Sequence, residues 1–136
     1  MNSVRQAFYP GQVPIDAYGN GGFRFADMSH RGSLLCLPGG MHGWEAVEAG
    51  EAVVEAGEAE CLRLHMFEAV IAEAGSIEVL LIGTGPNQVF LTPELREGLA
   101  AHGLFAEAMA TGAAARTYNV LLAEKRAVAA ALIAVD

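Results

Sequence analysis

The chain has 136 residues, of which 53% are hydrophobic, and a net charge of −8 at pH 7. This length and hydrophobic content predict one globular domain over residues 1–136. The 16 acidic residues outnumber the 8 basic ones, which argues against nucleic-acid binding, because that depends on clustered Lys and Arg. Direct membrane insertion is not expected either, since the longest apolar runs fall short of the roughly 20 residues that a bilayer span needs.

The two cysteines, Cys36 and Cys61, are too few for a disulfide scaffold. Cys36 lies in the apolar run Leu34–Leu37, so we expect a buried, reduced thiol there. The N-terminus lacks the basic and apolar segments of a signal peptide. Together with a composition rich in Ala and Gly and a single lysine, these observations predict a bacterial protein of the cytoplasm.

The first half of the chain predicts few regular elements. Residues 1–20 show no periodicity, so we expect an irregular N-terminal segment. Residues 23–27 alternate in polarity as a strand does, Ser29–Gly32 supplies turn residues, and Ser33–Leu37 is the expected returning strand of a hairpin. Residues 45–60, rich in Glu, Ala and Gly, are expected to be a connection.

From residue 62 the apolar spacing is helical and ends at Gly75. The nearly continuous apolar run over residues 77–82 predicts a strand buried on both faces. In the next helix, Thr92 is the expected N-cap, Pro93 the first helical residue and Gly103 the residue at the C-terminal cap.

The last part of the chain continues this alternation. Residues 104–110 are expected to be a strand, Thr111 to cap the final helix, residues 124–126 to form a charged turn, and residues 127–135 to be the last strand. The predicted order is β-β-α-β-α-β-α-β. Strands that alternate with helices indicate an α/β domain with a mainly parallel sheet covered by helices, which the opening hairpin makes mixed.

Four segments carry a family resemblance: Gly21-Gly22-Phe23-Arg24-Phe25, Val79-Leu80-Leu81-Ile82-Gly83-Thr84-Gly85, Arg116-Thr117-Tyr118-Asn119-Val120-Leu121, and Glu124-Lys125-Arg126-Ala127-Val128-Ala129-Ala130-Ala131-Leu132-Ile133. In their order and spacing they resemble the family that includes a mitochondrial complex I (NADH:ubiquinone oxidoreductase) assembly factor and its bacterial and archaeal relatives. The similarity covers roughly residues 15–136, and residues 41–61 depart from the expected pattern.

This resemblance implies a three-layer α/β fold around a five-stranded mixed sheet. It also implies a role in assembling complex I or another membrane complex. The expected partner is then a protein, either an assembly intermediate or a subunit of a membrane complex, and such a partner would hold the chain at the periphery of the inner membrane. An oligomer is compatible with the sequence, and no cofactor is implied.

The sharpest candidate site is Gly83-Thr84-Gly85, which follows a predicted buried strand and leads to Asn87. Glycines at such a position can expose backbone N–H groups to a phosphate. The third glycine of a dinucleotide fingerprint is absent, however, and the next helix starts only at Thr92. A tight turn whose glycines take positive φ is therefore the favoured interpretation.

A second set of candidates lies on the last helix: Thr111, Arg116, Thr117 and Asn119. A buried amide must be hydrogen-bonded, and we expect Asn119 to clamp the backbone of the loop over residues 83–87. Ligands of open α/β sheets usually bind at the same edge, so a small-molecule cleft made by these residues is the alternative.

Catalytic and metal-binding patterns are weak. Cys36, His42, Cys61 and His65 could supply four zinc ligands, but their spacing matches no standard zinc pattern, so no metal is expected. No serine has the flanking glycines of a nucleophile elbow. The sequence therefore favours a non-enzymatic binding or assembly factor, and the alternative is a small-molecule binder or an enzyme of unknown reaction.

Overall fold

The computed structural model describes residues 8–45, 54–55, 58–59 and 62–136. Within this part of the chain the main sheet has six strands in the order β1-β6-β5-β11-β9-β10. Strands β9, β10 and β11 run parallel, and β1, β6 and β5 join them through antiparallel pairs, so the sheet is mixed. The strands are β1 (Phe8–Pro10), β5 (Ser33–Leu37), β6 (Gly40–Trp44), β9 (Val79–Gly83), β10 (Ala106–Met109) and β11 (Val128–Leu132).

The described residues also form two smaller sheets. One has three antiparallel strands, β2 (Ala17–Gly19), β3 (Gly22–Phe25) and β4 (Met28–Arg31). The other pairs β7 (Val54–Glu55) with β8 (Glu58–Ala59), both inside the expected connection at 45–60, most of which lies outside the described residues.

The predicted five-stranded sheet and opening hairpin are both wrong in detail. The strand β3 returns through Ala26 and Asp27, whose φ angles of 49° and 62° are those of a tight two-residue hairpin turn. The expected turn residues therefore belong to β4, while Ser33–Leu37 pairs with β6 and β11 in the main sheet. Ala-Asp lacks the glycine that usually marks this turn, which explains the wrong register.

The expectation of an irregular segment over residues 1–20 is wrong for two short stretches and holds for residues 11–16. Residues Phe8–Pro10 form the edge strand β1, and Ala17–Gly19 form β2. Both strands have three residues, which is too short for an alternating pattern to be visible in the sequence.

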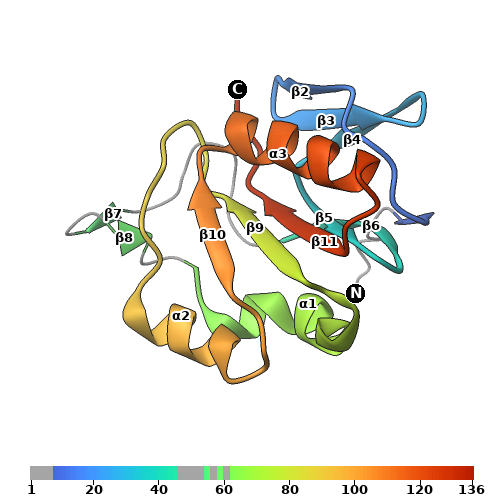
Figure 1. Cartoon of the computed structure of the whole chain (residues 1–136). Helices are drawn as coiled ribbons and strands as arrows, with labels where there is room; N and C mark the ends of the chain where they lie inside the picture. The colour runs from blue at the N-terminus through green and yellow to red at the C-terminus, as the bar shows by residue number, and fades with distance from the viewer. Residues whose placement is uncertain (1–7, 46–53, 56–57, 60–61) are drawn as a thin grey trace, which may run out of the picture.

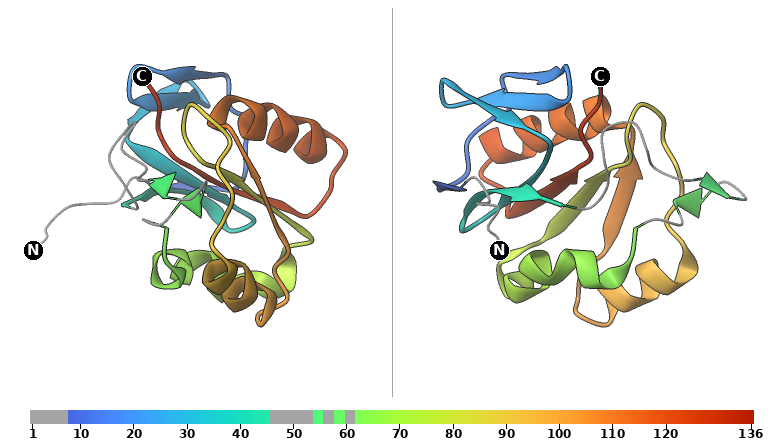
Figure 2. Two further views of the ribbon diagram at one scale, coloured as in Figure 1. Left: turned by 90° about the vertical axis from the view of Figure 1, so that its left-hand side faces the viewer. Right: turned by 180° about the vertical axis from the view of Figure 1, so that it is seen from behind.

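The helices cover both faces of the main sheet (Figures 1 and 2). On one face lie α1 (Glu68–Ala72), flanked by the short 3₁₀ turns Leu64–Phe67 and Ala74–Ser76, and α2 (Pro93–Ala100). On the other face lie α3 (Thr111–Ala123) and the β2–β3–β4 sheet. Together these elements form one mixed α/β domain.

The predicted ends of α2 are confirmed. The Thr92 hydroxyl accepts a hydrogen bond from the Leu95 amide at 3.2 Å, Pro93 is the first helical residue, and Gly103 has a φ of 82°. The predicted cap of α3 is wrong. Ala110 occupies the N-cap position, and Thr111 is the first helical residue.

The core has two parts, one on each face of the main sheet, and strand side chains are divided between them by alternation. In β5, Leu35 and Leu37 face α1 and α2, while Leu34 and Cys36 face α3. All five residues of β11 are buried. Its three consecutive alanines let both helical layers pack closely against the middle of the sheet.

Burial raises the pKa of the Cys36 thiol and of the Tyr118 hydroxyl above their ordinary values of 9.0 and 10.0. The folded protein keeps both protons at a pH where the unfolded chain loses them. The stability they contribute is therefore full below pH 9 and is lost as pH rises toward the higher folded pKa values.

We expect the free energy of unfolding to fall above about pH 9 by up to about 1.4 kcal/mol per pH unit for each group. Denaturant unfolding at a series of alkaline pH values measures this slope. Between about pH 9 and 10 the Cys36→Ala variant should show a shallower slope than the wild type. Equal slopes would mean that the Cys36 thiol ionises in the folded protein.

Candidate functional site

The loop after β9 and the start of α3 meet at the carboxyl ends of the parallel strands (Figure 1). Gly83, Thr84 and Gly85 are buried in this loop. Thr111 at the start of α3 is buried as well. We call Gly83, Thr84, Gly85, Thr111 and Ile133 the loop–helix joint.

Thr84 fastens the loop to β10. Its backbone amide donates to the Met109 carbonyl at 2.7 Å. Its hydroxyl lies 2.7 Å from the Asn87 carbonyl and 3.0 Å from the Met109 carbonyl, and accepts from the Val89 amide at 3.1 Å. The Thr84 hydroxyl is therefore fully engaged inside the protein.

Thr111 fastens the loop to the residue after β11. Its hydroxyl accepts from the Gly85 amide at 3.0 Å and donates to the Ile133 carbonyl at 2.7 Å. Its own amide donates to the Gly85 carbonyl at 2.8 Å. The Thr111 side chain thus joins three segments of the chain.

Two glycines of the joint are required by its geometry. Gly85 has a φ of 104°, which favours glycine. A Cβ on Gly83 would lie 3.0 Å from both the Cα and the hydroxyl oxygen of Thr111, closer than ordinary contacts allow. This geometry supports the tight-turn interpretation. A phosphate would need the Gly85 amide, which already donates to the Thr111 hydroxyl.

The other loop candidates lie at the surface. Asn87 and Arg116 are exposed, and Thr117 is half-buried. The Arg116 guanidinium donates to the Tyr18 hydroxyl at 3.4 Å. An open depression of about 450 Å³ lies between Tyr18, Arg116 and the first turn of α3. The side chains of Asn87, Arg116 and Thr117 therefore lie outside the loop–helix joint, although the Asn87 carbonyl is bonded to Thr84.

Asn119 is a clamp with a different partner from the one expected. Its side-chain oxygen accepts from the Ile15 amide at 2.8 Å, and its side-chain nitrogen donates to the Ile15 carbonyl at 2.8 Å. The predicted contact with residues 83–87 is wrong, because Asn119 lies two turns along α3 from Thr111 and faces the N-terminal segment instead. The segment around Ile15 was expected to be irregular, and no local pattern predicts that it lies against α3.

We expect Asn119→Leu to lower the free energy of unfolding by about 1–3 kcal/mol, because the amide and carbonyl of Ile15 lose their partners. Thermal or denaturant melts measure the change. Asn87→Leu is the matched control, since Asn87 is exposed, and should change stability by less than about 0.5 kcal/mol. If Asn119→Leu melts at the same temperature as the wild type, the Asn119 side chain does not stabilise the fold.

Further polar contacts of the N-terminal segment were not visible in the sequence. The Gln12 side-chain amide donates to the Val128 carbonyl at 2.6 Å, and the Tyr118 hydroxyl donates to the Val13 carbonyl at 2.8 Å. Together with Asn119, they hold residues 12–15 against α3 and β11. Of the three side chains that make these contacts, only Asn119 could be singled out from the sequence, because it is a polar residue on an otherwise apolar helix.

The described residues contain no group of three or more His, Cys, Asp and Glu side chains that could hold a metal ion. Cys36 is a free, buried thiol as predicted, and the His42 ring packs at a tilt of 55° against Phe8 with ring centroids 4.9 Å apart. Cys61, another of the four zinc candidates, lies outside the described residues. In the part of the chain covered by the structure, no helix is long and apolar enough to cross a membrane.

The fold is a single mixed α/β domain. At the candidate site, the polar groups of the loop after β9 are hydrogen-bonded within the protein. Residues 15–133 match the family described as protein of unknown function (DUF498/DUF598), and the chain belongs to this family. An uncharacterized protein of Rhodobacter capsulatus is 39% identical over 129 residues, which are 95% of this chain and 90% of that protein.

The resemblance to the complex I assembly factor family is confirmed. The mouse protein NADH dehydrogenase [ubiquinone] 1 alpha subcomplex assembly factor 3 is 27% identical over 131 residues. The match covers 96% of this chain but only 65% of the mouse protein, so the chain spans somewhat less than two thirds of that relative's length.

Solved structures confirm the fold. A protein described as an outer membrane protein from Bartonella henselae is 50% identical, with a TM-score of 0.79 over 94% of this chain and 99% of that chain. A Mth938-like domain from Bordetella pertussis is 28% identical, with a TM-score of 0.66 over 90% of this chain and 85% of that chain.

Proposed function

We propose that this protein is a non-enzymatic binding factor that holds a protein partner during the assembly of a larger complex. Respiratory complex I, or another membrane complex, is the proposed target. The similarity to a mouse protein named as an assembly factor supports this function. We place the protein in the cytoplasm, at the inner membrane only through its partner.

The observation that carries the proposal is that two phenylalanines beside β10, the last strand of the main sheet, are exposed. Phe90 is 63% exposed and Phe105, directly before β10, is 72% exposed. The segment that contains Phe90 runs along β10 (Figure 1), and the neighbouring Gln88 side chain donates to the Ala108 carbonyl at 2.9 Å. We call this surface the Phe90–Phe105 edge.

Two features of this edge suit a protein partner. Large aromatic side chains are enriched where proteins bind each other, because each one removes a large apolar area from water. In addition, the Gln88 contact occupies one of the outward backbone carbonyls of β10, which blunts the strand edge against uncontrolled pairing. Side-chain contacts with the phenylalanines, rather than an added strand, are therefore the proposed mode of binding.

The alternative, a small-molecule site at the loop over residues 83–87, has weaker support. The Thr84 and Thr111 hydroxyls and the Gly85 amide all bond to protein groups. A ligand at the neighbouring depression would meet Arg116 but no side chain arranged as a nucleophile with its base.

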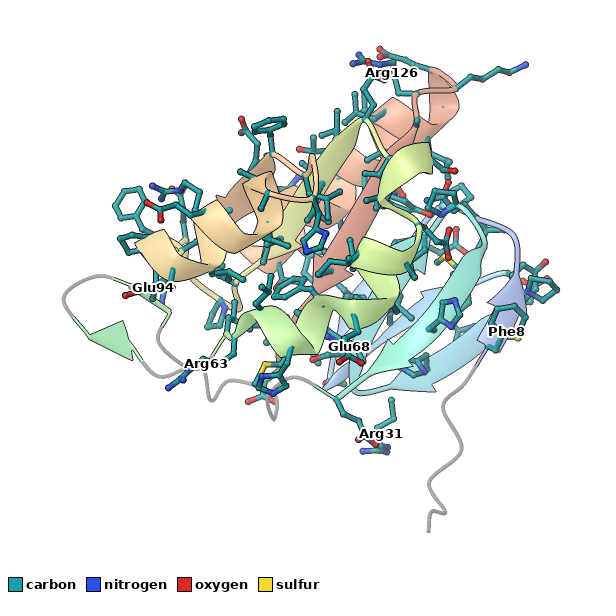
Figure 3. All side chains as sticks on the ribbon, turned by 90° about the horizontal axis from the view of Figure 1, so that it is seen from below. Phe8, Arg31, Arg63, Glu68, Glu94 and Arg126 are labelled. Atoms are coloured by element: carbon teal, nitrogen blue, oxygen red, sulfur yellow. The ribbon has the colours of Figure 1, made fainter. Side chains whose placement is uncertain are left out.

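Affinity capture from the native cell tests the proposal. The wild type should retain a specific partner protein, and the double variant Phe90→Ser and Phe105→Ser should lose most of it, because the apolar contact area is removed. Phe8→Ser is the matched control, since Phe8 is 57% exposed on β1 at the opposite edge of the same sheet (Figure 3).

All variants should keep the melting temperature of the wild type to within a few degrees, since each replaced ring is largely in solvent. Retention of the partner by the double variant, or its equal loss from Phe8→Ser, would exclude the Phe90–Phe105 edge as the binding surface.

A further inference from the structure

The outer face of the β2–β3–β4 sheet is a basic depression of about 420 Å³. In the antiparallel register, Arg24 lies opposite Ala17 and Ser29, and Gly22 lies opposite Gly19 and Arg31. Residues directly opposite each other share a face of the sheet. Because Phe23 and Phe25 point into the core, these partners line the solvent face.

The depression has a small-residue floor and basic walls. Ala17, Gly19 and Gly22 leave the backbone open to an approaching ligand, while Arg24 and Arg31 stand on either side. A Cβ on Gly22 would overlap the carbonyl oxygen of His30, so the open floor is fixed by the strand pairing. Figure 3 shows the Arg31 side chain projecting away from the ribbon.

The charge of this face differs from that of the whole chain. The face carries Arg24 and Arg31, and the lining of the depression contains neither Asp nor Glu, although the chain carries 16 acidic and only 8 basic residues. The Arg24 guanidinium donates to the Ser29 hydroxyl at 3.1 Å, which orients it over the depression. An arginine held in this way can offer its remaining N–H groups to a carboxylate as a pair of parallel hydrogen bonds.

A second depression continues this surface. Tyr18 lines both depressions, and Arg116, in the second turn of α3, lines the second one and donates to the Tyr18 hydroxyl. No side chain caps this end of the helix, whose dipole favours negative charge. Arg24 and Arg116 therefore lie on either side of Tyr18, but Asp136 also lines the second depression, so the first depression is the one suited to a negatively charged ligand.

We propose that this face binds an acidic, carboxylate-bearing peptide segment of a protein partner. Arg24 and Arg31 are diagonal neighbours on this face, so successive carboxylates of one peptide can contact both of them. A nucleic acid or an anionic membrane extends beyond this face and would meet the repulsion of the rest of a chain with net charge −8, whereas a short peptide segment stays over the two arginines. This surface is separate from the Phe90–Phe105 edge, so an experiment can disprove binding at one surface without disproving binding at the other.

A fluorescently labelled hexaglutamate peptide tests the proposal by anisotropy at low salt, where charge interactions are least screened. The wild type should bind the peptide saturably and lose affinity as salt rises. The double variant Arg24→Gln and Arg31→Gln should bind at least about tenfold more weakly, because it loses both charge-assisted contacts. Arg96→Gln, on α2 across the main sheet, removes one charge elsewhere and should keep binding within about twofold.

The same titration with inorganic phosphate and with phosphatidylglycerol vesicles separates the sources of negative charge. Neither should bind as tightly as the peptide. Absence of peptide binding, equal weakening by Arg96→Gln, or tighter binding of phosphate or vesicles would overturn the proposal. The melts of all variants are recorded in parallel, and a double variant that is unfolded is replaced by the single variant Arg31→Gln, whose side chain is exposed.

Discussion

Replacing Thr111 by Val should lower the free energy of unfolding by about 2–6 kcal/mol. The two side chains have nearly the same shape, so the change removes the hydroxyl with little effect on packing. It leaves the Gly85 amide and the Ile133 carbonyl without the partners they have at 3.0 Å and 2.7 Å. Each buried polar group left unpaired costs about 1–3 kcal/mol.

Thermal and denaturant melts measure this effect, which corresponds to a drop on the order of 10 °C in the melting midpoint. Thr117→Val makes the same chemical change at a half-buried position of the same helix and should have a much smaller effect. Equal melts for Thr111→Val and the wild type would show that the loop–helix joint does not stabilise the fold.

Replacing Phe67 by Ala should lower the free energy of unfolding by about 3–5 kcal/mol, the usual cost of emptying a large aromatic site in a core. Phe67 is fully buried, and its ring packs edge-on against Trp44 with centroids 5.3 Å apart. The Trp44 indole N–H donates to the Met66 carbonyl at 2.8 Å. This hydrogen bond limits how far the Trp44 ring can move to fill the cavity that Phe67→Ala leaves.

Phe105→Ala is the matched control for this experiment. It deletes the same side chain at a position that is 72% exposed, so stability should change by less than about 0.5 kcal/mol. Chemical denaturation of both variants gives the comparison. A large loss of stability from Phe105→Ala would mean that this residue belongs to the core and would weaken its proposed role in binding.

The second half of the fold could be predicted because its signals are local. The strand expected over residues 77–82 is β9, Val79–Gly83. The cap at Thr92, the proline after it and the glycine at position 103 lie within one helix and its ends. The parallel strands β9 and β10 are each followed by a helix with a clear helical period, so periodicity and end signals suffice there.

The place of β1 and β5 in the main sheet could not be predicted in the same way, because each has a strand partner that is distant in the chain. Leu34 in β5 pairs with Leu132 in β11, and Tyr9 in β1 pairs with Met41 in β6. Nothing near Ser33–Leu37 reveals such a partner, so that strand was assigned to the nearest hairpin.

The candidate site shows the same division. The buried glycines and threonine of the loop were located from the sequence, since a Gly-rich turn after a buried strand is a local pattern. The partner of Asn119 was not predicted. Both the loop over residues 83–87 and the segment over residues 12–15 could bond to its side chain, and only the tertiary path of residues 12–15 decides between them. Phe90 and Phe105 gave no sequence signal, because solvent exposure depends on which layer covers each side of β10.

The amide hydrogen-exchange rate of Gly85 tests most directly the claim that the joint is a structural element and not a ligand site. In the free protein this amide should exchange about as slowly as core amides such as that of Leu81, because Thr111 accepts its hydrogen. In Thr111→Val it should exchange much faster. Exchange in the wild type as fast as at the exposed Gln88, with protection gained only when a nucleotide or phosphate is added, would contradict the account and establish the loop as a binding site.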